Sequence, residues 1–409
     1  MYKQIIEQIP PMMAGDELTD ALRVRPEYDP NIIYTSVPER LMNMSDIYNV
    51  YEPSEMSAQI YSKLYLGLLR SLKKKGTRMA LLQQLENRQA VLDADCNSVI
   101  GGSDSFTIIG ESGVGKSRAV SRAISIMQGE KVIEIDKPYM KLLPVCVVQC
   151  PFDSSVKGML LEILRKIDES LGSRYHEIAL RGRMTTDMLI GSVSQACLNH
   201  IGLLIVDEIQ NVVNSKNGRN LVGALTQLIN NSGISIGMVG TPESAVFFES
   251  QMYLARRSLG LQFGSMQYDD YFRDLCRTLL SYRYVGEPFD ITDGMLRWLH
   301  EHCGGNISAL VSLIHDAQEN AIINGSEKLD MTALNSAYDK NLSFLHSYIR
   351  KEDPIVLPKP KKQKISVPEK RKCSPDVIGI EEVIRRAKAS EKNAIQQIRT
   401  VITVEEVAL

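Results

Sequence analysis

A pattern that binds phosphate occupies residues 106–117, which read FTIIGESGVGKS. Gly110, Gly115, Lys116 and Ser117 fit the spacing G-x-x-x-x-G-K-[ST], called the P-loop, with an apolar strand before it and a helix after it. Glycines let backbone N–H groups approach phosphate closely and adopt the positive φ angles of the turn. We therefore predict that Lys116 contacts the phosphates and that the Ser117 hydroxyl ligates Mg²⁺. The other binding residues predicted in this loop are Glu111, Ser112, Gly113 and Val114.

A pair of acids follows an apolar run at residues 203–208, which read LLIVDE. Four consecutive apolar residues are typical of a strand that is buried on both faces. Asp207 would hold the same Mg²⁺ as Ser117, and Glu208 would orient and polarise an attacking water. Acids after an apolar strand are common, so the pair gains its significance from following a P-loop.

A polar residue and two arginines extend this set of candidates. Residues 234–239 form a further apolar strand, and Thr241 follows its end, where it would sense a terminal phosphate. Arg256 and Arg257 follow a short helix predicted at residues 245–254. In a ring or filament, such an arginine can reach a phosphate held by the neighbouring subunit. An ordinary pair of surface arginines is the alternative at these positions.

Composition restricts the class of protein. The 409 residues are 44% hydrophobic and 23% charged, which is ordinary for a globular protein. A net charge of -2 excludes a globally basic nucleic-acid binder, although a local basic patch stays possible. Seven scattered cysteines argue against a disulfide framework. The N-terminus lacks an apolar signal region and no long apolar run follows, so we expect a cytoplasmic protein without a membrane partner.

The predicted elements divide the chain into five parts. Residues 98–270 alternate strands and helices, which predicts an α/β core with a parallel sheet sandwiched by helices. Residues 271–350 are predicted as a small helical lid. Residues 1–97 form an N-terminal extension, which is irregular at first and then helical, and is a possible selector-binding region. Residues 351–376 are a basic linker rich in Pro and Lys, and residues 377–409 an amphipathic helix and tail.

Several local expectations accompany this division. A helix starting near Ser54 or Ser57 ends in the lysine run 73–75, which we expect to be a solvated helix end, with contact to DNA phosphates or a partner as the alternative. A second helix is predicted at residues 78–91. Residues 266–271 are expected to complete the sheet.

Other expectations concern a loop and two thiols. Residues 211–218 are predicted to be a polar loop. Cys146 and Cys150 lie on one face of a predicted strand, where we interpret them as small core residues.

Together these motifs describe an AAA+ ATPase module. The segments GLLIVDEIQ (202–210), VGTPE (239–243) and LARR (254–257) resemble the TnsC branch of the TnsC/TniB family of AAA+ transposition regulators. The resemblance covers residues from about 31 to about 337. It implies that the cofactors are ATP and Mg²⁺ and that Arg256 or Arg257 acts in trans on ATP bound by a neighbouring subunit.

The resemblance also implies partners and a mechanism. ATP-bound subunits of such proteins assemble on double-stranded target DNA, without sequence preference, as a ring or helical filament, a heptamer among the options. The assembly connects a target-selection protein of TniQ or TnsD type to transposase subunits of TnsA and TnsB type. We expect the C-terminal tail to contact the transposase. ATP hydrolysis would disassemble or remodel the assembly.

DNA would lie in the pore of such a ring, against loops of the α/β core. Lys157 follows one core strand, and Arg181 and Arg183 lie in a turn before a predicted helix. These charges would bind phosphates without reading bases, and ordinary surface charge is the alternative for each. Residues 305–308 read GNIS and lack the arginine that many AAA+ proteins use as a second sensor. Whether the lid senses the bound nucleotide is therefore left open.

Two other classes of ATPase compete with this interpretation. A helicase loader or initiator would be expected to carry a winged-helix domain after the lid, where this sequence has a basic linker and one predicted helix. A signalling NTPase that does not act on DNA would usually carry a long sensor or repeat region, and the sequence shows no such pattern.

Overall fold

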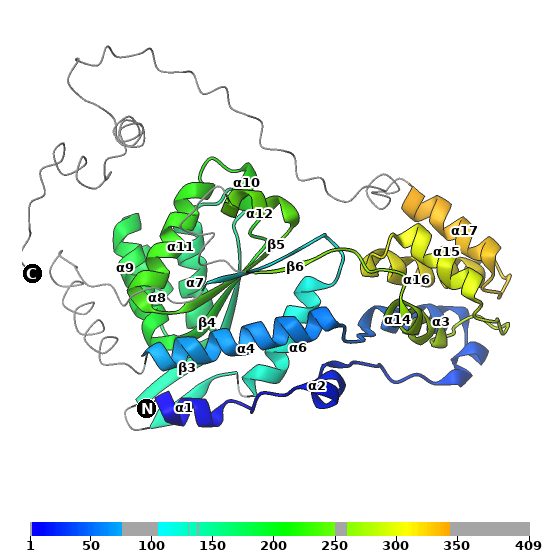
Figure 1. The fold of residues 1–409 in the computed structure, drawn as a ribbon, viewed down its shortest axis with the longest axis horizontal. Helices are drawn as coiled ribbons and strands as arrows, with labels where there is room; N and C mark the ends of the chain where they lie inside the picture. The colour runs from blue at the N-terminus through cyan, green and yellow to red at the C-terminus, as the bar shows by residue number, and fades with distance from the viewer. Residues whose placement is uncertain (1, 76–104, 130, 137–138, 250–259, 344–409) are drawn as a thin grey trace, which may run out of the picture. The chain divides into compact units, whose positions relative to one another are not determined.

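The computed structural model describes residues 2–75, 105–129, 131–136, 139–249 and 260–343, which all belong to one compact unit, Met1–Lys351 (Figure 1). The predicted helix at 78–91, Arg256 and Arg257, the basic linker and the C-terminal helix lie outside the described residues. Among the described helices, none combines the length and apolarity that crossing a bilayer requires.

A six-stranded sheet forms the centre of the α/β core, in the order β2-β3-β4-β5-β1-β6. Every neighbouring pair is parallel except β2 and β3, which are antiparallel. The predicted parallel sheet is therefore confirmed. The strands are β1 (Phe106–Gly110), β2 (Ile133–Asp136), β3 (Tyr139–Gln149), β4 (Ile201–Asp207), β5 (Ser235–Gly240) and β6 (Leu261–Phe263).

Helices cover both faces of this sheet, as Figure 1 shows. One face is covered by α7 (Val156–Leu171), α9 (Thr186–His200) and α11 (Gly218–Ser232), whose apolar side chains pack with β3 and β4. The other face is covered by α4 (Glu55–Lys75) and α6 (Lys116–Gln128). Burial on both sides explains why β1, β4 and β5 read as continuous apolar runs.

Short helices complete the core. They are α8 (Tyr175–Arg181), α10 (Asn211–Asn214) and α12 (Pro242–Glu249). The expectation of a polar loop at 211–218 was wrong at its start, since α10 lies there; the Asn211 amide donates to the carbonyl of Cys150 (2.9 Å) and fixes this turn. Cys146 and Cys150 are buried free thiols, as predicted, and burial raises their pKa to about 12 and about 11.

The lid has a hydrophobic core of its own. Its elements are α14 (Asp270–Ser281), α15 (Asp293–Cys303), α16 (Ile307–Ile323), α17 (Met331–Ala337) and the π-helical turn η3 (Tyr338–Leu342). The prediction that residues 266–271 complete the sheet was wrong, because β6 occupies that edge. The backbone N–H of Met266 instead donates to the carbonyl of Gly305 (3.0 Å), which attaches this connection to the lid.

The first fifty residues pack against both of these parts, and we call residues 2–50 the N-terminal strap. Its helices α1 (Tyr2–Gln8) and α2 (Gly15–Leu22) bury apolar side chains with α4 and α6. Its later elements bury Met44, Ile47 and Val50 in the core of the lid. These elements are η1 (Pro30–Tyr34), α3 (Val37–Met44) and η2 (Ser45–Asn49).

One ion pair fixes the strap to the lid. The Arg40 guanidinium donates two hydrogen bonds to the carboxylate of Glu327, at 2.7 and 2.6 Å, and one to the carbonyl of Tyr284 at 3.1 Å. The Arg40 side chain is only 6% exposed, so water competes little for these bonds. The strap is thus held to the lid by a partly buried ion pair as well as by apolar packing.

The end of α4 corrects a prediction about the lysine run. Lys73 is exposed, as expected, but Lys75 is fully buried. Its ammonium donates to the carbonyls of Cys197 (2.6 Å), Leu198 (2.9 Å) and Ile201, where α9 ends and β4 begins. The last carbonyls of a helix lack partners within the helix, so the hydrogen bonds that Lys75 donates satisfy them. Lys75 therefore caps a second helix and is not a solvated end.

Candidate active site

The P-loop connects β1 to α6, as its motif predicts. Gly113 and Gly115 have φ angles of +81° and +96°, a region that favours glycine, and Gly115 is the N-cap of α6. The ammonium of Lys116 donates to the carbonyls of Gly110 and Glu111, both at 2.7 Å. Burial lowers the pKa of Lys116, and the nearby carboxylate of Asp207 opposes this shift. The loop thus presents a cation and the amino end of a helix together.

The acidic pair lies at the end of β4, two strands away from β1. The Asp207 carboxylate accepts a hydrogen bond from the backbone N–H of Glu208 (2.9 Å). Glu208 has a φ of +57°, which is uncommon for a residue other than glycine. The Gln210 amide donates to the Glu208 carboxylate. Ile209 donates its N–H to the carbonyl of Val239 (3.0 Å), which ties this turn to the end of β5.

Parallel strands bring these motifs together, because the carboxyl ends of β4, β5 and β1 meet at one edge of the sheet. A cavity of about 310 Å³ opens there. The predicted residues that line it are Ser112, Gly113, Gly115, Lys116, Ser117, Asp207, Glu208 and Thr241. Three predicted loop residues lie elsewhere: Gly110 ends β1 against the carbonyl of Phe263, the Val114 side chain is buried, and Glu111 accepts a bond from Ser265.

The cavity offers oxygen donors for a magnesium ion. The hydroxyl of Ser117 and the carboxylate of Asp207 both line it. Mg²⁺ is bound in proteins through one or two such oxygens together with water and the phosphates of a nucleotide. The donor set that the motif predicts is therefore present in one place, and it fits this ion.

Sequence patterns missed part of the cavity lining. Tyr48 comes from η2 of the strap, and Ile307 and Val311 come from the first turns of α16. These side chains give the cavity an apolar side opposite in character to the P-loop. No local motif marks them, since they reach the cavity only through the packing of the strap against the lid. The other lining residues that were not predicted are Arg118, Gln210, Gly240 and Ser308.

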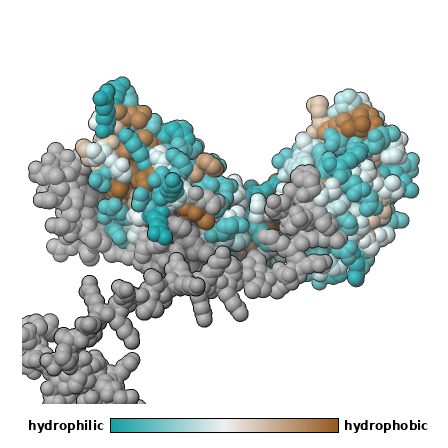
Figure 2. All heavy atoms as spheres, turned by 90° about the horizontal axis from the view of Figure 1, so that it is seen from above, coloured by the Kyte–Doolittle hydropathy of each residue, from teal (hydrophilic) through white to brown (hydrophobic). Residues whose placement is uncertain are grey.

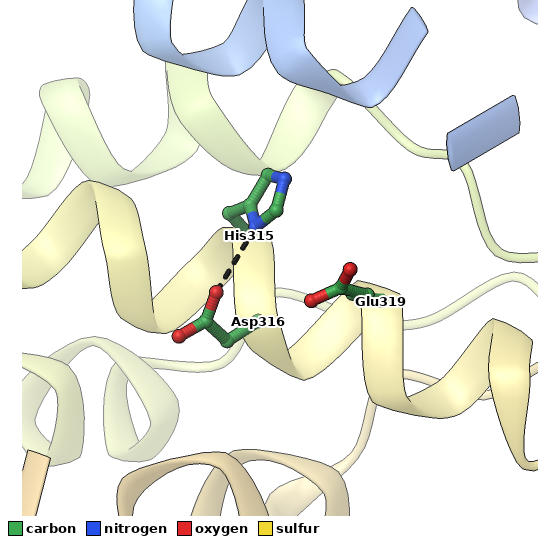
Figure 3. A group of neighbouring side chains, drawn as sticks. All are labelled: His315, Asp316 and Glu319. Atoms are coloured by element: carbon green, nitrogen blue, oxygen red, sulfur yellow. Dashed lines mark hydrogen bonds and ion pairs between the residues drawn. The ribbon is translucent and has the colours of Figure 1, made fainter. Parts of the chain in front are cut away.

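Three polar side chains of α16, His315, Asp316 and Glu319, lie close together (Figure 3). The ligating atoms of His315, Asp316 and Glu319 lie within 4.8 Å of one another, as in a metal site. However, Asp316 already accepts from Asn341 (2.7 Å) and lies 3.0 Å from His315 Nδ1, and the His315 ring packs on Tyr48 with centroids 4.8 Å apart. His315 and Asp316 thus already have partners, and His315 packs against Tyr48.

The predicted DNA residues lie away from the cavity lining. Lys157 is exposed in the first turn of α7. The Arg181 side chain is 80% exposed and forms an ion pair with Glu177. Arg183 is exposed and has a φ of +47°. The structure adds Phe152, which is 91% exposed in the loop that precedes Lys157. Described residues on the face in Figure 2 are mostly hydrophilic, with separate apolar areas among them.

Hydrogen bonds hold the loop that carries Phe152. The Ser154 hydroxyl donates to the carbonyl of Asn211 (3.0 Å), and the hydroxyl of Ser215 donates to the carbonyl of Asp153 (2.8 Å). An aromatic side chain is thus presented to solvent by a well-anchored backbone. Its only sequence signal was a position directly after a core strand.

Comparison with known proteins agrees with this arrangement. Residues 100–246 match the family model described as an AAA domain. The fold is that of an AAA+ P-loop NTPase. The matched region holds the P-loop, the acidic pair and Thr241 of the AAA+ core. No curated protein matches the sequence.

Several solved structures resemble the chain. They include the ORC1 protein of Aeropyrum pernix in complex with DNA (16% identity, TM-score 0.42), the RuvB branch migration motor of Thermotoga maritima (11%, 0.36) and Drosophila ORC bound to DNA (12%, 0.38). The matches cover 63%, 64% and 90% of this chain, and 65%, 68% and 88% of those chains. The chain therefore spans slightly less than two thirds of the ORC1 protein. At these identities the likeness concerns the fold alone.

Proposed function

We propose that this protein is an ATP-hydrolysing regulator of DNA transposition of the TnsC type. The observation that carries the ATPase part is the meeting of Lys116, Ser117, Asp207, Glu208 and Thr241 around one cavity. A phosphate-binding cation, two magnesium donors and a carboxylate for the attacking water are the groups that phosphoryl transfer to water requires. ATP and Mg²⁺ are the cofactors in this proposal.

Each residue has a separate task in the proposed reaction. Lys116 and the P-loop amides hold the β- and γ-phosphates, while Ser117 and Asp207 hold Mg²⁺, directly or through water. When bound there, Mg²⁺ would supply positive charge against the phosphates. Glu208 orients the attacking water, and Thr241 contacts the γ-phosphate. Tyr48, Ile307 and Val311 supply the apolar side of the cavity, and they are the residues that would take up the adenine base.

Assembly on target DNA is the second part of the proposal. It is supported by the order of the DEIQ, GTPE and LARR segments, which resembles the TnsC branch. The proposed trans-acting arginine is Arg256 or Arg257. A TniQ- or TnsD-type selector and TnsA- and TnsB-type transposase subunits are the proposed partners. The proposed division of the chain into N-terminal extension, core, lid, linker and tail keeps the predicted boundaries after residues 97, 270, 350 and 376.

Contacts to duplex DNA are assigned to the exposed rim of the core. Lys157, Arg181 and Arg183 supply positive charge there. Phe152 is added because it is an exposed aromatic in the loop that precedes Lys157, and aromatic side chains stack on or wedge between bases. Phosphate contacts of this kind bind without sequence preference and weaken with salt.

Electron microscopy of the purified protein with duplex DNA tests the proposal. We expect rings or filaments with a non-hydrolysable ATP analogue, and none with ADP or with Lys116→Ala. Absence of any DNA-bound assembly in both nucleotide states would overturn the regulator part and favour a signalling NTPase. Assembly on single-stranded but not duplex DNA would favour a helicase loader.

A further inference from the structure

The amino end of the lid helix α16 is hydrogen-bonded to the backbone of the P-loop. The Asn306 side chain donates from Nδ2 to the carbonyl of Ser112 at 2.7 Å. The backbone N–H of Ser308 donates to the carbonyl of Gly113 at 3.0 Å. Two consecutive carbonyls of the P-loop are therefore held by the lid.

A third bond reaches the same stretch from the connection between core and lid. The Ser265 hydroxyl donates to the carboxylate of Glu111 at 2.6 Å. The next residue, Met266, is bonded to the lid through Gly305. Three successive P-loop residues, 111 to 113, thus have partners in or beside the lid.

These bonds decide which way the P-loop amides point. A trans peptide is planar, so the C=O of one residue and the N–H of the next point in opposite directions. With the carbonyls of Ser112 and Gly113 facing α16, the N–H groups of Gly113 and Val114 point away from it. Amide N–H groups are what a P-loop uses to bind phosphate. The lid contact therefore fixes the orientation of the groups that bind the anion.

Asn306 is held so that it can make this contact in one way only. It is the N-cap of α16, and its Oδ1 accepts the N–H of Ala309 at 3.2 Å while its Nδ2 donates to Ser112. A Cβ atom built on Gly113 would lie 2.4 Å from Asn306 Oδ1. The close approach and the positive φ thus both require glycine at residue 113.

We propose that Asn306 is a positioning residue that couples the lid to the phosphate-binding loop. The coupling rests on the nucleotide binding proposed above. It uses the dipoles of a side-chain amide and of a helix N-terminus, in a segment, residues 305–308, that contains no arginine. Because coupling between two sites is reciprocal, phosphate binding orders the amino end of α16, and an ordered lid contact tightens nucleotide binding by the same factor.

The substitution Asn306→Asp removes the proposed bond, and it also adds a negative charge beside the P-loop. An aspartate is an equally good N-cap and keeps the acceptor for Ala309, but it cannot donate to Ser112. Asn320→Asp is the matched control, since it makes the same chemical change on α16 about 20 Å further along the helix. Asn320 donates to the carbonyl of Asp316 and accepts from the ammonium of Lys340 (3.1 Å), and both of these partners lie outside the P-loop.

Two measurements test the coupling on the full chain. ATP dissociation constants in Mg²⁺ are measured by calorimetry, and hydrogen exchange by mass spectrometry follows the peptides that contain residues 111–117 and 305–313, with and without ATP. We expect Asn306→Asp to weaken ATP binding about tenfold and to abolish the ATP-dependent protection of 305–313. Asn320→Asp should keep both, and both variants should melt within about 3 °C of the wild type without nucleotide.

The possible outcomes separate the coupling from the proposed ATPase. If the wild type binds ATP and Asn306→Asp shows the same affinity and the same protection of 305–313, the positioning role is overturned while the ATPase stands. If the wild type does not bind ATP, the proposed function itself fails. A loss of affinity in Asn320→Asp equal to that in Asn306→Asp would also overturn the positioning role, because it would show a general effect on α16.

Discussion

Removing the ion pair between Arg40 and Glu327 should loosen the strap from the lid. Arg40→Met keeps most of the apolar stem but removes three donated hydrogen bonds, and Glu327→Gln keeps the shape of the acceptor but removes its charge. The double variant completes a cycle that isolates the energy of the pair from the effects of each single change.

The coupling free energy between Arg40 and Glu327 should lie between the values known for exposed and for buried ion pairs. Exposed ion pairs contribute about 0.2–1 kcal/mol, whereas breaking a buried pair costs about 3–5 kcal/mol. Arg40 is 6% exposed and Glu327 29%, and the pair is bidentate. We therefore expect a coupling of about 2 kcal/mol at pH 7, which corresponds to roughly a thirtyfold change in the unfolding equilibrium.

The coupling should also depend on pH in a defined direction. The hydrogen bonds from Arg40 lower the pKa of Glu327 below its ordinary value of 4.5. As the pH falls, the unfolded carboxylate takes up a proton before the folded one does, so the stabilisation is complete above pH 4.5 and is lost as the pH falls through the folded-state pKa.

Trp298, the only tryptophan, lies in α15 and reports on the lid. Its fluorescence during urea unfolding at pH 7 and at pH 3.5 gives the stability of all four proteins of the cycle. A coupling below about 0.5 kcal/mol at pH 7 would refute the reasoning. So would a coupling that grows as the pH falls from 7 to 3.5.

Three further predictions concern the core. Lys116→Ala should abolish ATP binding in calorimetry while Lys157→Ala, a matched removal of an exposed lysine, keeps it; equal binding by both would remove Lys116 from the site. Glu208→Gln should bind ATP normally but hydrolyse it roughly a hundredfold more slowly, and normal turnover would contradict the role of Glu208. Burial lowers the pKa of Lys75 to about 7, and its unfolded form keeps a proton up to about 10.5. The stability of the wild type should therefore rise relative to Lys75→Met by up to about 1.4 kcal/mol per pH unit above 7; parallel curves from pH 6 to 9 would exclude this.

The sequence predicted those features whose signal is local. The P-loop motif and the apolar runs before Asp207 and Thr241 each lie within one short segment, and the rule that parallel strands share an edge brings them together. Within the lid, the ends of α15 are marked locally by the capping residue Thr292 and by Gly304.

Features that depend on tertiary packing were missed. Lys75 looks like a solvated helix end, and only the nearby carboxyl end of α9 makes it a buried cap. The three-residue strand β6 is too short to show periodicity, so the sheet edge was assigned to the following residues. Tyr48 and Ile307 reach the cavity from segments more than 250 residues apart in the chain, and no local pattern relates them.

The N-terminal strap is synthesised long before the lid against which its second half packs. Arg40 leaves the ribosome 287 residues before its partner Glu327. At typical translation speeds this delay lasts roughly 15–60 s, while a helix forms within microseconds. During that time Met44, Ile47 and Val50 have no lid to pack against. The apolar side chains in this second half of the strap therefore stay exposed until the lid is made. Completion of the native structure is therefore a late event that closes a very long loop, and chaperones have that interval in which to bind the strap.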